Sequence, residues 1–152
     1  MKRSDALKPL SRDHHGALVV AQQLRRATEA EPARQSFLEF WHADGRKHFR
    51  VEEEVLLPVW ALYGEVDRDA IGRMLDDHLW IRREALRAEQ SADGVTLDEL
   101  QELGERLAAH VRFEERELFG AIEANLDEEA LSDLAVRVIE AESRAPHEDG
   151  GD

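Results

Sequence analysis

Apolar residues recur along this chain at steps of three and four residues, without the alternation that marks a strand. The clearest row occupies the inward positions Phe37, Trp41, Gly45, His48, Glu52, Val55 and Val59. Rows with the same period run through residues 11–30, 67–90 and 96–124, and a shorter one follows Asp127. The pattern therefore predicts an all-α protein with four long helices and a short fifth one.

Capping residues stand where these helices should begin, at Ser11, Asp67, Thr96 (in a capping box with Glu99) and Asp127. Pro32 separates the first two helices, and Pro58 should kink or end the second one near its last turn. Short connections between long helices predict an up-down-up-down four-helix bundle, with the fifth helix at its C-terminal end, over residues 1–145. The polar, glycine-rich residues 146–152 are predicted to form a disordered tail.

Two of the predicted helices carry the same polar insertion in their apolar row, the sequence H-x-x-x-E-E. It begins at His48 and again at His110. Residues four apart lie on one face of a helix, so each copy directs an imidazole and a carboxylate the same way. The other two long helices each place one histidine, after an aspartate, in their apolar row. The inward polar set is therefore His14, His48, Glu52, His78, His110 and Glu114.

Buried glutamates point to a metal site, because ionised carboxylates are rarely buried unless they are paired or bound to a cation. No lysine or arginine occupies a matching inward position. Four histidines and two glutamates from four helices predict a two-metal centre in which Glu52 and Glu114 are shared. Imidazole and carboxylate ligands suit iron, manganese or zinc rather than calcium or copper(I). Without metal, repulsion between the two carboxylates should raise the pKa of at least one of them.

Other polar residues near these helices rank below the six. His15 competes with His14, since neighbouring residues cannot both face inward, and the phase of the helix favours His14. Glu53, Glu54 and Glu115 are rotated from the inward row and are predicted to be solvated. His42 and His147 are interpreted as structural or incidental. A metal-free bundle, in which the buried polar groups satisfy each other, is the alternative to a metal site.

Charge and composition narrow the range of partners. The 152 residues carry a net charge of −14, which disfavours nucleic acid and anionic membrane surfaces. The absence of cysteine excludes disulfides, thiolate zinc sites and cysteine nucleophiles. Neither a leader with an apolar segment nor a run long enough to span a membrane is found. We therefore expect a cytoplasmic protein.

On these residues the chain resembles the hemerythrin-like, or HHE cation-binding, family over roughly residues 10–123. The family signature, H-x-x-x-E-E followed by a Leu-Leu-Pro turn, is matched from His48 to Pro58. The resemblance implies a carboxylate-bridged pair of iron ions, also linked by an oxo or hydroxo bridge, that meets O2 or related small molecules. The oxygen-carrying members have a further histidine where Met74 stands, and their second acidic ligand falls at the position of Glu115.

The function predicted from these features is that of a non-haem di-iron protein that senses or scavenges O2, NO or peroxide, or holds iron. Manganese or zinc in place of iron is the alternative metal content. An enzyme of the ferroxidase or peroxidase type, built on the same centre, is a second possibility that the sequence leaves open. The expected partner is a small diatomic or peroxide ligand, and no protein partner is identified.

Overall fold

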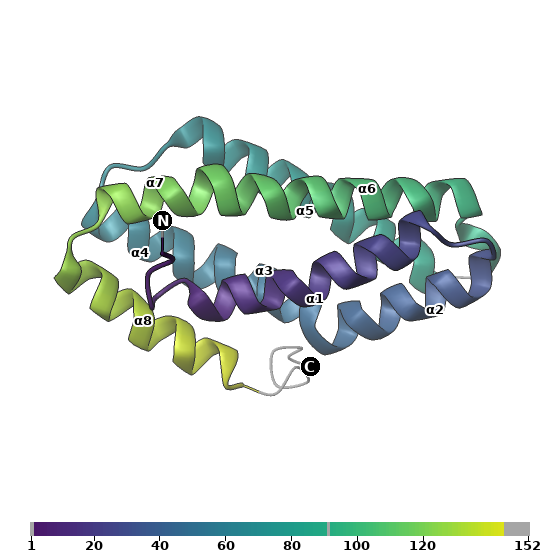
Figure 1. The fold of residues 1–152 in the computed structure, drawn as a ribbon, viewed down its shortest axis with the longest axis horizontal. Helices are drawn as coiled ribbons and strands as arrows, with labels where there is room; N and C mark the ends of the chain where they lie inside the picture. The colour runs from purple at the N-terminus through teal and green to yellow at the C-terminus, as the bar shows by residue number, and fades with distance from the viewer. Residues whose placement is uncertain (1, 91, 145–152) are drawn as a thin grey trace.

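The computed structural model describes residues 2–90 and 92–144, and helices dominate this part of the chain (Figure 1). The helices are α1 (Lys8–Arg25), α2 (Ala30–Phe40), α3 (Arg46–Val51), α4 (Leu57–Tyr63), α5 (Arg68–Gln90), α6 (Leu97–Phe113), α7 (Phe119–Asn125) and α8 (Glu128–Glu142), with a 3-10 turn at Ala92–Gly94. No strand occurs among the described residues, which confirms the all-α prediction. The predicted tail, residues 146–152, lies outside them.

Three π turns join some of these helices into longer continuous stretches. They are Trp41–Gly45 between α2 and α3, Glu52–Leu56 between α3 and α4, and Glu114–Leu118 between α6 and α7. The N–H group that follows each turn bonds to the carbonyl five residues back, as in Leu57 to Glu52 and Phe119 to Glu114. Each turn thus contains one residue more than an α-helical turn.

The π turn at Glu52–Leu56 changes two expectations about the second helix. The helix does not end at Pro58 but continues to Tyr63, and Pro58 lies in the first turn of α4. The wider turn just before it accommodates a residue that lacks an N–H group. It also shifts the apolar row by one position, so that Leu56, rather than the predicted Val55, is fully buried.

Most of the predicted helix starts are confirmed. Asp67 accepts a bond from the N–H of Ala70, Thr96 forms the capping box with Glu99, and the Asp127 side chain accepts from the N–H of Ala130. Ser11 is the exception, because α1 already begins at Lys8. The Ser11 hydroxyl donates instead to the Glu115 carboxylate, 2.8 Å away.

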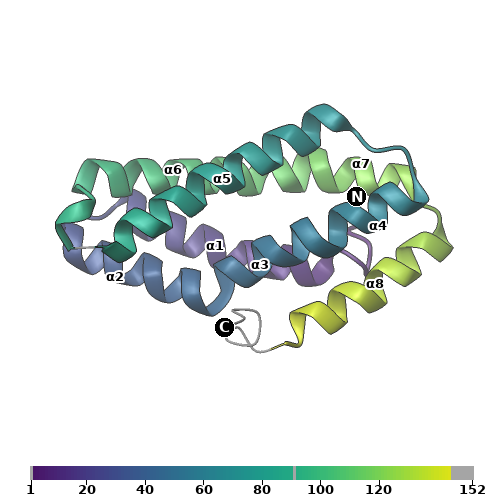
Figure 2. The same ribbon diagram turned by 180° about the vertical axis from the view of Figure 1, so that it is seen from behind.

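The helices pack around two separate apolar clusters with the polar residues between them. α1 packs most extensively along α6, and α5 contacts both α2 and α6 (Figures 1 and 2). Gly104 allows the close approach of α1, since a Cβ there would lie 2.6 Å from the carbonyl oxygen of Ala21. One cluster contains Leu24 and Phe37, and the other contains Trp60 and Phe119. Along each long stretch the inward histidines fall between the residues of these two clusters.

α8 lies alongside the bundle, in contact with α3 and with the π turn at Glu52–Leu56. Its C-terminal end reaches the middle of the bundle, close to α1 (Figure 1). Lys47 holds that end, because its Nζ donates to the carbonyl of Glu142 at 2.9 Å. None of the helices in the described part of the chain is both long and apolar enough to cross a lipid bilayer.

Candidate metal centre

The six predicted residues meet in the interior, and all six are buried. They form two groups with the spacing of metal ligands, and both groups contain Glu52 and Glu114. The first group adds His14 and His48, and the second adds His78 and His110. Within each group the ligand atoms lie within 4.8 Å of one another. Two groups that could each hold a metal ion therefore share the same pair of carboxylates.

Each imidazole directs its Nε2 atom at a carboxylate oxygen. The distances are 2.8 Å for His14 to Glu114, 3.1 Å for His48 to Glu52, 3.2 Å for His78 to Glu52 and 3.1 Å for His110 to Glu114. Two ligands of one metal ion, with bonds of about 2.1 Å at right angles, would lie about 3 Å apart. The spacing of these atoms fits that arrangement.

Most of these atoms have no hydrogen-bond partner, although they are buried. This holds for Nε2 of His48, His78 and His110, for both carboxylate oxygens of Glu52 and for Oε2 of Glu114. The approaches of 3.1–3.2 Å lack the geometry of a hydrogen bond. Buried polar atoms in native proteins are almost always satisfied. A set of unsatisfied nitrogen and oxygen atoms that converge on one place is what a metal site without its ions contains, so the residues fit a pair of cations.

The other ring nitrogen of every histidine is held by a carboxylate. The Nδ1 contacts are His14 to Glu115 at 2.6 Å, His48 to Asp13 at 2.9 Å, His78 to Glu53 at 2.6 Å and His110 to Asp77 at 3.0 Å. Histidines that bind metal characteristically donate their second N–H to such a group, which fixes the orientation and tautomer of the ring. The arrangement thus presents all four Nε2 atoms to the interior.

These four carboxylates were misjudged or missed in the sequence. Glu53 and Glu115 were predicted to be solvated, and that prediction is wrong, because both are half-buried against a histidine. Both belong to π turns, in which successive residues rotate by less than in an α-helix, so each stays close to the inward glutamate before it. Asp13 and Asp77 were noted only as neighbours of His14 and His78. Each serves a histidine on a different helix, which no local pattern reveals.

The remaining histidines behave as expected where they are described. His14 is buried and His15 is exposed, so the phase predicted for the first helix is confirmed. His42 is exposed and contacts Glu89 at 2.7 Å. His147 lies outside the described residues. Met74, one helical turn before His78, is fully buried within an apolar cluster.

In the metal-free protein the charges of the centre are balanced by protons on the histidines. Burial lowers the pKa of His14 and of His78, but the surrounding glutamates outweigh it and raise both values to about 10. Burial also raises the pKa of Glu114, yet His110 and its neighbours hold that pKa well below its usual range. The pKa of Glu52 is lowered as well, despite burial and the nearby Glu114. The expectation of a raised carboxyl pKa is therefore wrong, because it neglected the four imidazoles.

Aromatic rings fix two of the imidazoles further. Phe49 stacks on His78 with the ring centroids 3.8 Å apart, and Phe119 stacks on His14 at 5.2 Å. His14 and His78 are thus each held at Nδ1 by a carboxylate and on one face by a ring. The orientation of these two Nε2 atoms is therefore set by their neighbours in the fold.

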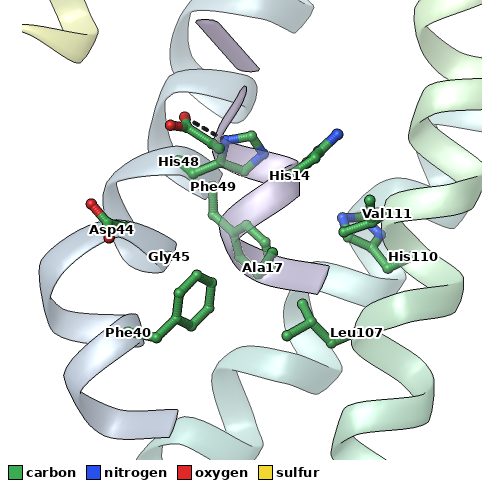
Figure 3. A pocket seen from close by; sticks show the side chains of 11 residues that line it. His14, Ala17, Phe40, Asp44, Gly45, His48, Phe49, Leu107, His110 and Val111 are labelled. Atoms are coloured by element: carbon green, nitrogen blue, oxygen red, sulfur yellow. Dashed lines mark hydrogen bonds and ion pairs between the residues drawn. The ribbon is translucent and has the colours of Figure 1, made fainter. Parts of the chain in front are cut away.

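A small cavity adjoins the centre on one side (Figure 3). His14, His48 and His110 border it, and its other walls are mainly apolar, with Ala17, Phe40, Gly45, Phe49, Leu107 and Val111. Its volume of about 20 Å³ is enough for one molecule the size of water. Polar groups that could bond a guest are restricted to the histidines and to Asp13 and Asp44 at its edge.

Asp13, His48 and Glu142 form a third group with metal-ligand spacing. Burial and the neighbouring Asp13 raise the pKa of Glu142 to about 8, so this carboxyl group holds a proton at neutral pH. Asp13 can therefore accept from Glu142 and from His48 together. Because His48 already belongs to the first group, we interpret this third group as support for the His48 ring.

Replacing Asp77 by asparagine tests the role of these outer carboxylates. The substitution keeps the shape of the side chain but removes the charge that faces Nδ1 of His110. Losing such a contact costs roughly 10- to 100-fold in metal affinity. Competition with a chelator should show that decrease for Asp77→Asn and none for Asp69→Asn, an exposed carboxylate on the same helix. Equal affinities in the two variants would contradict the assigned role.

Comparison with known proteins assigns the chain to a protein family. The model of the hemerythrin HHE cation-binding domain matches residues 5–122. A curated DNA nickase from Nostoc sp. (strain PCC 7120) is 28% identical over 142 residues, which cover 91% of this chain and 39% of that protein. The chain thus spans about two fifths of the length of this relative. No solved structure matches the chain significantly.

Proposed function

This chain belongs to the hemerythrin HHE cation-binding family, and from this premise we propose that its buried centre binds two iron ions and presents them to a small diatomic ligand, O2 or NO. Manganese and zinc are the alternative metals. The observation that carries the proposal is the set of buried, unsatisfied nitrogen and oxygen atoms on His48, Glu52, His78, His110 and Glu114. A metal-free structural bundle would hold these atoms together only as ion pairs that lack hydrogen-bond geometry.

In the proposed arrangement His14 and His48 hold one ion, His78 and His110 hold the other, and Glu52 and Glu114 contact both. The four long helical stretches would alternate in direction, and each would contribute one histidine to the centre. When bound, the ions supply redox chemistry and a position for an exogenous ligand. The protein's own groups orient the imidazoles through the Nδ1 contacts, and the two apolar clusters keep bulk water away from the centre.

The small cavity favours a diatomic ligand over peroxide. Peroxide brings two O–H groups that need hydrogen-bond partners, whereas most of the cavity wall consists of apolar side chains such as Phe40, Leu107 and Val111. O2 and NO lose little on entering such surroundings. We therefore place sensing or scavenging of a diatomic gas ahead of a peroxidase or ferroxidase activity, and measurement of peroxide turnover by the iron-loaded protein separates the two.

We do not extend the activity named for the Nostoc relative to this chain. That protein is described as a DNA nickase, and this chain covers 39% of it. The net charge of −14 works against a nucleic-acid partner, because phosphate groups would be repelled. The proposed function accordingly involves a small ligand and no DNA.

Metal content of reconstituted protein tests the proposal. Protein loaded with ferrous iron under anaerobic conditions and then desalted should retain about two ions per chain. His14→Ala should retain about one, since it removes one terminal ligand, while the matched control His15→Ala should retain two. A parent protein with no tightly bound ion, or a loss in His15→Ala instead of His14→Ala, would contradict the assigned ligands.

A further inference from the structure

A row of exposed leucines follows the outer side of α5, away from the metal centre. Leu75, Leu79 and Leu86 are 43%, 68% and 60% exposed. Steps of four and seven residues place them on one face of the helix. His78, which points into the centre, is rotated by about 100° from Leu79, and the buried Ile81 lies on the face opposite the leucines. In Figure 2, α5 lies at the front of the molecule with no other element in front of it.

Gly72 continues this row one turn towards the N-terminus of α5. It lies within the helix, and a Cβ at this position would meet nothing within 4 Å. A glycine inside a helix costs about 1 kcal/mol relative to alanine, and packing among the residues that the structure describes gives no reason for it. A missing side chain in an exposed row does permit the close approach of another helix. The row therefore combines exposed apolar side chains with a space above Gly72 that could receive a side chain from another helix.

The charged residues along one edge of the row would pair with those of a second copy of the helix that runs in the opposite direction. Asp69 and Asp76 lie in its N-terminal half, and Arg83 lies in its C-terminal half. Neither aspartate has an ion-pair partner among the described residues. Arg83 is 59% exposed, although it also contacts Glu84. In an antiparallel pair of identical helices the same edge of each copy meets, so that Asp76 of one copy would face Arg83 of the other.

We propose that the chain forms a two-fold symmetric homodimer in which α5 packs antiparallel against α5 of a second copy. Leu79 lies at the two-fold axis and meets its own equivalent, which places Leu86 of each copy against Gly72 of the other. Such a contact uses the same patch on both subunits, as two-fold dimers require. The row from residue 72 to residue 86 is about 21 Å long, which makes this a small interface and a concentration-dependent dimer.

The second copy is favoured over other occupants by the charge pattern. A lipid surface would favour basic residues alone around the leucines, but Asp69 and Asp76 flank them together with Arg82 and Arg83. A different protein would need its own arrangement of charges, whereas this edge of α5 already contains both members of each pair. The interface does not depend on the metal, so its test is independent of the proposed function.

Leu79→Glu, with Leu62→Glu as its matched control, tests the dimer by light scattering over a range of concentrations. Leu62 is 66% exposed on α4 and has the same chemistry on a different face. The parent should approach twice its 17.3 kDa mass. Leu79→Glu should raise the dissociation constant at least about tenfold by placing two like charges at the axis, and Leu62→Glu should match the parent. A monomeric parent, or an equal effect of both variants, would overturn the proposal.

Charge exchange supplies a second, independent readout. Asp76→Arg and Arg83→Asp should each weaken the dimer, and the double variant should restore it, because the pairs form again with the signs reversed. Both positions are on the surface, and Arg87 still pairs with the buried Glu84 when Arg83 is replaced, so the helical circular dichroism of the single variants should equal that of the parent. Additive weakening in the double variant would overturn the antiparallel pairing.

A single introduced cysteine locates the axis directly, since the chain has none of its own. Leu79→Cys should form a disulfide-linked dimer under mild oxidation, faster than Leu62→Cys under the same conditions. Equal rates, or faster linkage at position 62, would place the contact elsewhere.

Discussion

Removal of the metal from loaded protein should lower the thermal midpoint by on the order of 10 °C at pH 7. Ligands that bind only the native state stabilise it by mass action, by about 2.7–4.1 kcal/mol at free concentrations of 100 to 1,000 times the dissociation constant. In a chain of this size each kcal/mol corresponds to about 2–4 °C. Differential scanning calorimetry of the iron-loaded and chelator-treated protein measures the difference. An unchanged midpoint would contradict metal binding by buried ligands.

The difference in midpoint should increase with pH, because metal and protons compete for the same imidazoles. In the metal-free protein the pKa values of His14 and His78 are raised to about 10, above the ordinary value of 6.5. The stability contributed by these protonated rings is complete below pH 6.5 and is lost as pH rises towards 10. In the loaded protein the rings carry no such proton, so its stability decreases instead below pH 6.5. Midpoints measured at pH 6, 7 and 8.5 should therefore diverge steadily. A gap that stays constant or narrows with pH would contradict the raised pKa values of these two histidines.

Glu114→Gln should abolish binding of both ions, although it alters a single ligand. Glu114 belongs to both ligand groups, so its loss weakens each of them, whereas His78 belongs to one group only. We expect almost no retained iron in Glu114→Gln, about one ion in His78→Ala and about two in Glu117→Gln, an exposed glutamate in the same π turn. Iron analysis and the near-ultraviolet absorption of the oxidised protein provide the measurement.

The iron content of Glu114→Gln can also contradict the sharing of this carboxylate between two ions. If Glu114→Gln loses only one ion, then this carboxylate serves a single metal and the two sites are independent. Circular dichroism of the metal-free variants serves as the control for folding. Glutamine preserves the size of the side chain, so the effect is not caused by a cavity.

The six central residues could be found in the sequence because each depends only on helical phase. His48 with Glu52, and His110 with Glu114, stand four apart in rows whose other members are apolar, and a period of 3.6 fixes the direction of such pairs. The choice of His14 over His15 relied on the same phase. Where the pattern is local and regular, it identified both the helices and the residues that they turn inward.

The outer carboxylates could not be found in this way. Asp13 serves His48 and Asp77 serves His110, so their roles depend on how far neighbouring helices slide along each other. Glu53 and Glu115 depend on π turns, which a search for regular periods treats as α-helix. The prediction of a raised pKa for Glu52 or Glu114 was wrong for a related reason. Repulsion between the two carboxylates alone would raise their pKa values, but four imidazoles from other parts of the fold lower them.

The π turns at the two glutamates determine how the fold would respond to the deletion of one residue there. Deleting one residue from an ordinary α-helix rotates everything beyond it by about 100° and destroys its packing. Deleting one residue of Glu52–Leu56 or Glu114–Leu118 that follows the paired glutamates would instead turn the wide turn into a regular one. The remainder of α4 or α7 would keep its apolar face towards the core. Loss of one residue there should therefore be tolerated by the fold, and what it changes is the direction of the carboxylate that supports the neighbouring histidine.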